Sequence, residues 1–121
     1  MIRTLSFLAL MTATPALAEE VSTGAGAMLR GLDKVNGETT DIKLENGGSA
    51  SYGPLSVELT ECRFPQGNPA GDAYAFLTIR EQDNDGVLFQ GWMIASAPAL
   101  NALDHSRYDV WVLRCITSEG D

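Results

Sequence analysis

The sequence predicts an all-β fold: a small single-domain sandwich or barrel of about seven short strands, with one short helix and one disulfide. Three observations support it. Short β-rich runs alternate with Gly, Pro and Asn turns along most of the chain. Helical spacing occurs only once, where Leu100 and Leu103 follow Ser96 and Pro98. Two cysteines, Cys62 and Cys115, follow an export signal and are typical of a disulfide.

The first eighteen residues resemble a cleaved export signal. Arg3 supplies a positive start, Leu5–Met11 a short apolar run, Pro15 a helix break and Ala16–Ala18 small residues for a signal peptidase. The alternative, a retained anchor, is disfavoured because the apolar run is shorter than the roughly 20 residues that span a bilayer. We expect an exported, periplasmic protein that begins at Glu19 and has no later transmembrane segment.

Composition argues against whole classes of partner. The chain carries 8 Lys and Arg against 16 Asp and Glu, a formal net charge of −8. Such an acidic surface repels nucleic acids and anionic lipids, since binding them depends on basic side chains. The length predicts one domain. We place the signal peptide at 1–18, a flexible tail at 19–26, the β domain at 27–117 and a C-terminal tail at 118–121.

The two cysteines admit two readings. In an exported domain an even count favours a Cys62–Cys115 disulfide, which would stabilise the fold by about 4 kcal/mol by restricting the unfolded chain. The alternative pairs one cysteine with His105 as a nucleophile, which requires a free thiolate. An oxidising compartment favours the disulfide.

Turn chemistry and residue alternation locate the elements. Asn36-Gly37 predicts a tight hairpin between the first two strands, with positive φ at both positions. Ser96 is the expected cap of the short helix, and Pro98 fits its first turn. The expected strands are Met28–Val35, Glu38–Leu44, Ser49–Tyr52, Leu55–Cys62, Ala73–Arg80, Val87–Ile94 and Tyr108–Ile116.

The alternation of side chains along two strands predicts which face each cysteine lies on. Cys62 is out of phase with the alternating Leu55, Val57 and Leu59, so it lies on the other face or follows a β-bulge. In the last strand, Trp111 shares parity with Leu113 and Cys115. This spacing predicts a core centre in which the disulfide packs beside Trp111.

Several polar residues are weak candidates for a functional site. Glu81–Gly86, with Asp83 and Asp85, resembles the start of a calcium loop, but Trp92 stands where a bidentate Glu is needed, so we expect a hairpin turn. Asp104 and Asp109 with the single His105 are too few for a typical metal site, and no cofactor motif is present. Asp72, Glu58 and Glu61 have no spacing that makes them a carboxylate pair.

A catalytic reading would use Ser96, His105, Asp104 and Asp109, as in a cell-envelope hydrolase. Ser96 lacks the flanking glycines of a nucleophile elbow, so we interpret it as a helix cap. His105 reads as a turn residue that bonds backbone groups. We therefore expect a protein without catalytic residues, although the sequence alone leaves the enzyme reading open.

The aromatic residues Trp92, Trp111 and Tyr108 are candidates for the core or for an interface. Stacking on a sugar is their alternative role. Together with the acidic turn, they leave a weak calcium-binding or glycan-binding module as a further alternative.

One long stretch resembles a known family. It comprises Gly91-Trp92-Met93, Ala95 to Leu103, His105 and Tyr108 to Val112 before Cys115. The likeness extends upstream through Leu32 to Gly37, Gly53-Pro54-Leu55, Cys62 and Ala75 to Leu77. These residues are similar to a proteobacterial family of small exported proteins, domain of unknown function 2155. Pro65 and Pro69 stand where that family usually carries Pro-Pro, and Ser106 where it often has Pro.

The resemblance implies export, one domain, paired cysteines and no assigned activity. It also brings an association with genome neighbourhoods near an accessory subunit of respiratory complex I. We expect a non-catalytic periplasmic binding or accessory module with a protein partner in the cell envelope, and a respiratory complex is one candidate. The sequence leaves the oligomeric state open.

Overall fold

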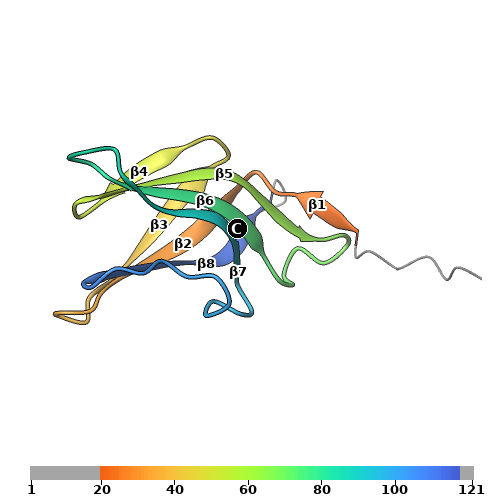
Figure 1. Ribbon diagram of the computed structural model, residues 1–121. Helices are drawn as coiled ribbons and strands as arrows, with labels where there is room; N and C mark the ends of the chain where they lie inside the picture. The colour runs from red at the N-terminus through yellow and green to blue at the C-terminus, as the bar shows by residue number, and fades with distance from the viewer. Residues whose placement is uncertain (1–19, 118–121) are drawn as a thin grey trace, which may run out of the picture.

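The all-β prediction is confirmed. The computed structural model describes residues 20–117, and within this range the chain forms eight strands and no helix (Figure 1). The expected signal peptide and the tail at 118–121 lie outside the described residues. The strands are β1 (Val21–Thr23), β2 (Gly26–Asp33), β3 (Thr39–Glu45), β4 (Ser49–Tyr52), β5 (Leu55–Pro65), β6 (Tyr74–Glu81), β7 (Val87–Ile94) and β8 (Tyr108–Ile116).

The strands form two antiparallel sheets that lie as two layers in Figure 1. The larger sheet has the order β1-β5-β6-β7, and β4 also pairs with β5. The smaller sheet has the order β3-β2-β8. β1 pairs with Arg63–Pro65 and β4 with Leu55–Glu58, so the long β5 holds both along different parts of its length.

The core lies between the two sheets because alternate residues of each strand point inward. In β5, Leu55, Val57 and Leu59 are fully buried. In β8, the buried residues are Val110, Val112, Cys115 and Ile116. The remaining buried apolar residues include Ala27, Leu29, Ile42, Leu44, Ala75, Leu77, Ile79, Phe89, Met93 and Leu103.

The predicted disulfide forms between Cys62 and Cys115, with Cα atoms 5.6 Å apart, and ties β5 of one sheet to β8 of the other. The register of β5 against β6 skips Thr60, and the register of β8 against β2 skips Leu113. Each skipped residue is a bulge that reverses the alternation ahead of a cysteine. Of the two readings of Cys62, the bulge is therefore the one that forms.

The bulge in β8 also overturns the expected position of Trp111. Val110 and Val112 point inward, whereas Trp111 is half-buried on the outer face of the smaller sheet. Leu113 is likewise half-buried. Cys115 points into the core only because the extra residue, Leu113, shifts the alternation of β8 by one position. The disulfide therefore does not share a face with Trp111.

The expected short helix after β7 does not form. Ala97 donates its N–H to the carbonyl of Ile94 and Leu100 donates to that of Ala97, which are bonds across three residues rather than four. Forming the first helical turn is unfavourable, and in this short segment Leu103 is the only buried apolar side chain that could offset that cost. The segment is instead a chain of turns.

Two local features also differ from expectation. Val21–Thr23, placed in the tail, forms β1 because it pairs with the end of β5. In the Asn36-Gly37 turn, only Gly37 has a positive φ, of 77°. Asp33 donates its N–H to the Glu38 carbonyl and Gly37 donates to the Asp33 carbonyl, so the connection is longer than the expected two-residue turn. The side-chain oxygen of Asn36 accepts the N–H of Glu38 within it.

Candidate functional site

The segment between β7 and β8, residues 95–107, crosses from the larger sheet to the smaller one and is anchored at three points. Ser96 donates from its backbone N–H and its hydroxyl to the Asp72 carboxylate, at 2.9 and 2.6 Å. The Asn101 side chain donates to the Trp92 carbonyl at 2.9 Å. Leu103 inserts into the core with 5% of its surface exposed. These anchors hold the 95–107 loop beside the outer face of β8.

The bonds at Asp72 also explain its acidity. Partial burial by itself would raise the pKa of the Asp72 carboxyl, but the hydrogen bonds from Ser96 and Ala73 stabilise the ionised form more strongly. The net effect lowers the pKa. Ser96 is therefore a partner of Asp72 across 24 residues of sequence rather than a helix cap.

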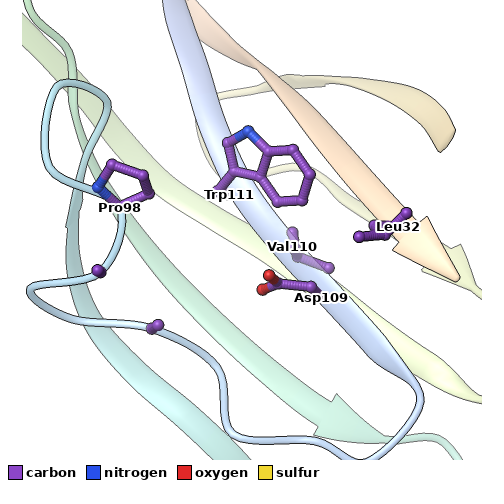
Figure 2. A pocket seen from close by; sticks show the side chains of 7 residues that line it. Leu32, Pro98, Asp109, Val110 and Trp111 are labelled. Atoms are coloured by element: carbon purple, nitrogen blue, oxygen red, sulfur yellow. The ribbon is translucent and has the colours of Figure 1, made fainter. Parts of the chain in front are cut away.

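A pocket with a volume of about 410 Å³ lies between this loop and the smaller sheet (Figure 2). Figure 2 shows Pro98 on the loop side, Trp111 and Asp109 on β8 and Leu32 on β2. The pocket lining is Leu32, Pro98, Ala99, Ala102, Asp109, Val110 and Trp111. Leu100, which follows Ala99 in the loop, is 77% exposed. We call this pocket, together with the neighbouring Leu100, the loop–β8 pocket.

The two tryptophans differ in what surrounds their rings. Trp92 meets Phe76 edge to face at a ring separation of 5.3 Å, and the Arg63 guanidinium lies 5.0 Å from its ring. Trp111 packs against the core at its base, but between residues 20 and 117 no ring, cation or hydrogen-bond partner contacts its indole. Trp111 thus has the indole that remains available to a ligand.

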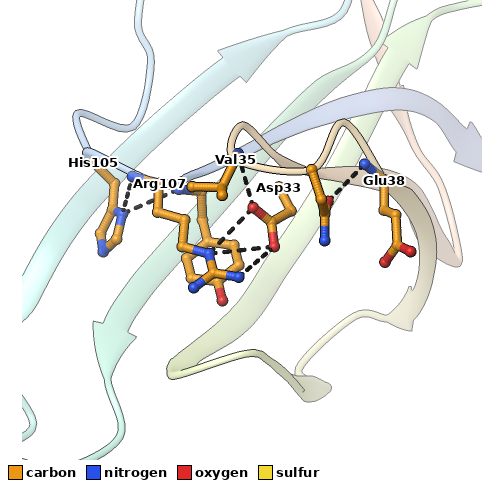
Figure 3. Close-up of polar contacts among 7 residues, drawn as sticks. Asp33, Val35, Glu38, His105 and Arg107 are labelled. Carbon is orange, nitrogen blue, oxygen red and sulfur yellow. Dashed lines mark hydrogen bonds and ion pairs between the residues drawn. The ribbon is translucent and has the colours of Figure 1, made fainter.

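Beside the pocket, a partly buried ion pair between Asp33 and Arg107 lies at the residue before β8 (Figure 3). The Arg107 guanidinium donates to both oxygens of Asp33, with the shortest contact at 2.9 Å, and lowers the pKa of that carboxyl. Asp33 is only 8% exposed. Lys34 donates its N–H to the Arg107 carbonyl and its ammonium to the His105 carbonyl. These contacts join the end of β2 to the strand that carries Asp109 and Trp111.

His105 takes part in the same corner as an acceptor. Its Nδ1 accepts the backbone N–H groups of Arg107 and Tyr108, at 3.0 and 3.1 Å (Figure 3). A nitrogen occupied in this way cannot serve as a base toward a substrate. The Tyr108 ring packs edge to face against Tyr52 at 5.4 Å.

The residues of the catalytic reading lie in separate settings. Ser96 bonds to Asp72, His105 bonds to backbone groups, and Asp109 lines the loop–β8 pocket. Asp104 is exposed on the loop. Within residues 20–117 no three His, Cys, Asp or Glu side chains are grouped in a way that could hold a metal ion.

The acidic turn between β6 and β7 is held by its own amides. The Asn84 side chain donates to the Glu81 carboxylate and accepts the Gly86 N–H. Asp85 has a φ of 56°, the left-handed conformation that Asp tolerates in turns. Asp83 and Asp85 are both exposed on this hairpin.

Sequence reasoning missed most of the pocket. The sequence assigns Pro98 to a helix and gives Leu32, Ala99 and Ala102 no role in a site, and it does not indicate that Asp33 and Arg107 form a pair. One feature of the sequence points to the pocket: apart from Asn101, the stretch Ala97 to Leu103 is apolar, although it contains Pro98 and lies between strands. An apolar segment that forms neither a strand nor a helix is a candidate contact surface.

Comparison with known proteins gives a family without an assigned activity. The model of a family described as an uncharacterized protein conserved in bacteria (DUF2155) matches residues 27–115. An uncharacterized protein of Rickettsia prowazekii (strain Madrid E) is 28% identical over 87 residues, covering 69% of this chain. The chain spans 56% of that relative's length. No solved structure matches. In the described residues no helix is long and apolar enough to cross a membrane.

Proposed function

The chain belongs to the bacterial family of domain of unknown function 2155, and we propose that it is a non-catalytic module of the cell envelope that binds a partner protein at the loop–β8 pocket. The observation that carries this proposal is the apolar surface at one site. Trp111 and Leu32 are half-buried there, and Pro98, Ala99, Leu100 and Ala102 are exposed. Exposed apolar surface of this kind marks contact sites in proteins.

The rigidity of the site also supports binding. The loop is held by the Ser96–Asp72 and Asn101–Trp92 contacts, and β8 is held by the Asp33–Arg107 ion pair. A surface that is already ordered loses little conformational entropy when a partner docks. Tryptophan is enriched among residues that dominate binding energy, and the Trp111 indole has the free ring that such a role needs.

The hydrolase alternative draws no support from this geometry, because its serine and histidine are each bonded to structural partners. The export signal that the sequence predicts favours a partner in the envelope, and the disulfide is compatible with an oxidising compartment. A subunit of a respiratory complex and a peptidoglycan-associated protein are both candidate partners.

Site-specific photo-crosslinking in cells tests the proposal. A benzophenone amino acid is placed at Leu100, which is 77% exposed and follows the pocket residue Ala99, and in a control at Val87, which is 51% exposed at the start of β7. We expect one protein adduct from the Leu100 probe, abolished by Trp111→Ala and absent from the Val87 probe. Mass spectrometry then identifies the partner.

Two results contradict the proposal. One is the absence of any adduct at Leu100 in a folded protein. The other is the same set of adducts from both probes, because a specific site on one face cannot produce equal labelling at the far end of β7.

A further inference from the structure

We infer that the loop–β8 pocket receives a lysine or arginine side chain from a basic segment of the partner. This inference rests on the proposed function and adds the chemistry of the group that is recognised. It starts from Asp109, which is the only acidic side chain among the described residues that line the pocket.

Asp109 differs from other carboxylates whose partners are known. Asp33 bonds to Arg107, Asp41 bonds to Arg30 at 2.8 Å, and Asp72 bonds to Ser96. Between residues 20 and 117, Asp109 has no hydrogen bond or ion pair. An ionised carboxylate against apolar walls is most strongly complemented by a cation that also brings hydrogen-bond donors.

The surroundings of Asp109 fit a cation on an apolar stem. Figure 2 shows the Asp109 carboxylate on the same strand as the Trp111 indole, with Pro98 opposite. An indole attracts an ammonium or guanidinium group through its ring face. Leu32 and the loop alanines would contact the methylene groups, as apolar surfaces do with the stems of lysine and arginine. The pocket therefore matches both parts of a basic side chain.

The charge of the whole chain favours the same partner. A formal net charge of −8 attracts a basic segment and repels an acidic one before contact is made. A divalent metal ion fits poorly, because it takes several oxygen ligands and the pocket lining offers one carboxylate. Most of the pocket lining is apolar, which a small cation alone would leave without a contact, so the lining favours a side chain of a protein.

The test is an NMR titration of the expected mature chain, Glu19–Asp121, with trilysine amide, with triglutamate amide as the opposite-charge probe. We expect saturable shifts in the Trp111 indole N–H and the Ala99 and Ala102 amides with trilysine only. Asp109→Asn should weaken trilysine binding about threefold or more, since it removes one partly exposed ion pair. Asp104→Asn is the matched control, because it removes the same charge from an exposed position of the loop outside the pocket lining.

Equal weakening by Asp109→Asn and Asp104→Asn would overturn the inference, because diffuse surface charge would then explain binding. Trilysine shifts that avoid the pocket, or an absence of binding by a folded protein, would overturn it too. The Leu100 crosslink separates these results from failure of the proposed function. A crosslink that depends on Trp111 but not on Asp109 would support the proposed docking site and reject the binding of a basic side chain in it.

Discussion

Trp92 and Trp111 show how one residue type acquires two roles from its neighbours. Both are half-buried on outer faces of sheets. The ring of Trp92 is occupied by Phe76 and Arg63, whereas that of Trp111 borders the loop–β8 pocket. Residue type alone could not separate them, because the difference lies in side chains brought near by other strands.

Trp111→Ala should therefore leave the protein folded, in contrast to the unfolding that a core position would imply. A half-buried outward side chain should contribute about 1–2 kcal/mol, below the 3–5 kcal/mol of a fully buried tryptophan. Urea unfolding measures the loss, and the Leu100 crosslink measures binding. Trp92→Ala is the matched control: it should lose comparable stability and keep the adduct. A Trp111→Ala protein that is unfolded would refute this assignment.

At the scale of elements, one bulge in β5 and one in β8 decide which way the two cysteines face. Thr60 and Leu113 each add one residue to a strand, and each bulge brings the following cysteine into the inward phase. Strict alternation would leave Cys62 and Cys115 on outer faces, where they could not meet between the sheets. The bulges are therefore what makes the disulfide geometrically feasible.

Deleting Thr60 should be tolerated, because removing the extra residue itself restores regular alternation between Leu59 and Cys62 without a bulge. Without the extra residue, Leu59 and Glu61 become neighbours opposite Leu77 and Phe76, which are already adjacent, and Cys62 keeps its inward phase. We expect a folded protein with no free thiol by titration with a thiol reagent. Deleting Glu58, in the regular part of the strand, is the control: it turns Leu55 and Val57 outward and should abolish folding. Two free thiols in the Thr60 deletion variant would show that Thr60 is not the residue that sets the inward direction of Cys62.

At the scale of the whole molecule, covalent and ionic contacts join parts distant in sequence. The disulfide joins the two sheets across 53 residues, and the Asp33–Arg107 pair joins the end of β2 to the residue before β8 across 74. The Asp72–Ser96 bonds attach the loop after β7 to the segment before β6. A small domain has a limited core, so such contacts matter to its stability.

Removing the disulfide by the double substitution Cys62→Ala and Cys115→Ala should lower the free energy of unfolding by about 4 kcal/mol, because it frees a long loop in the unfolded chain. Equilibrium urea unfolding of the oxidised and substituted proteins measures the difference. Reduction of the unaltered chain is the control and should produce a similar loss. An unchanged midpoint in both experiments would show that the bridge does not stabilise the fold.

Acid should destabilise the protein through three paired carboxylates. Hydrogen bonds from Arg107 and Arg30 lower the pKa values of Asp33 and Asp41, and the pKa of Asp72 is also lowered. Each ionised carboxylate stabilises the fold fully above the unfolded-state pKa of about 3.9, and this contribution is lost as pH falls through the lower folded-state pKa. We expect a constant melting temperature from neutral pH to about 5 and a decline below about 4.

The matched variant for the acid experiment carries Asp33→Asn, Asp41→Asn and Asp72→Asn together. It should melt at a lower temperature at neutral pH and decline less on acidification, because it has lost the groups that titrate. A decline as steep as that of the unaltered protein would assign the acid sensitivity to other carboxylates.

The amino-acid sequence by itself determined the strands, since alternation and turn residues act locally and seven strands appear near their expected places. It also indicated the pairing of Cys62 with Cys115, because two cysteines allow one bridge. Tertiary structure alone decided the phase of each strand after its bulge, the turns in place of the helix and the outward face of Trp111. The loop–β8 pocket belongs to that second group. Its walls come from β2, β8 and the loop between β7 and β8, and only packing of the two sheets brings these segments together.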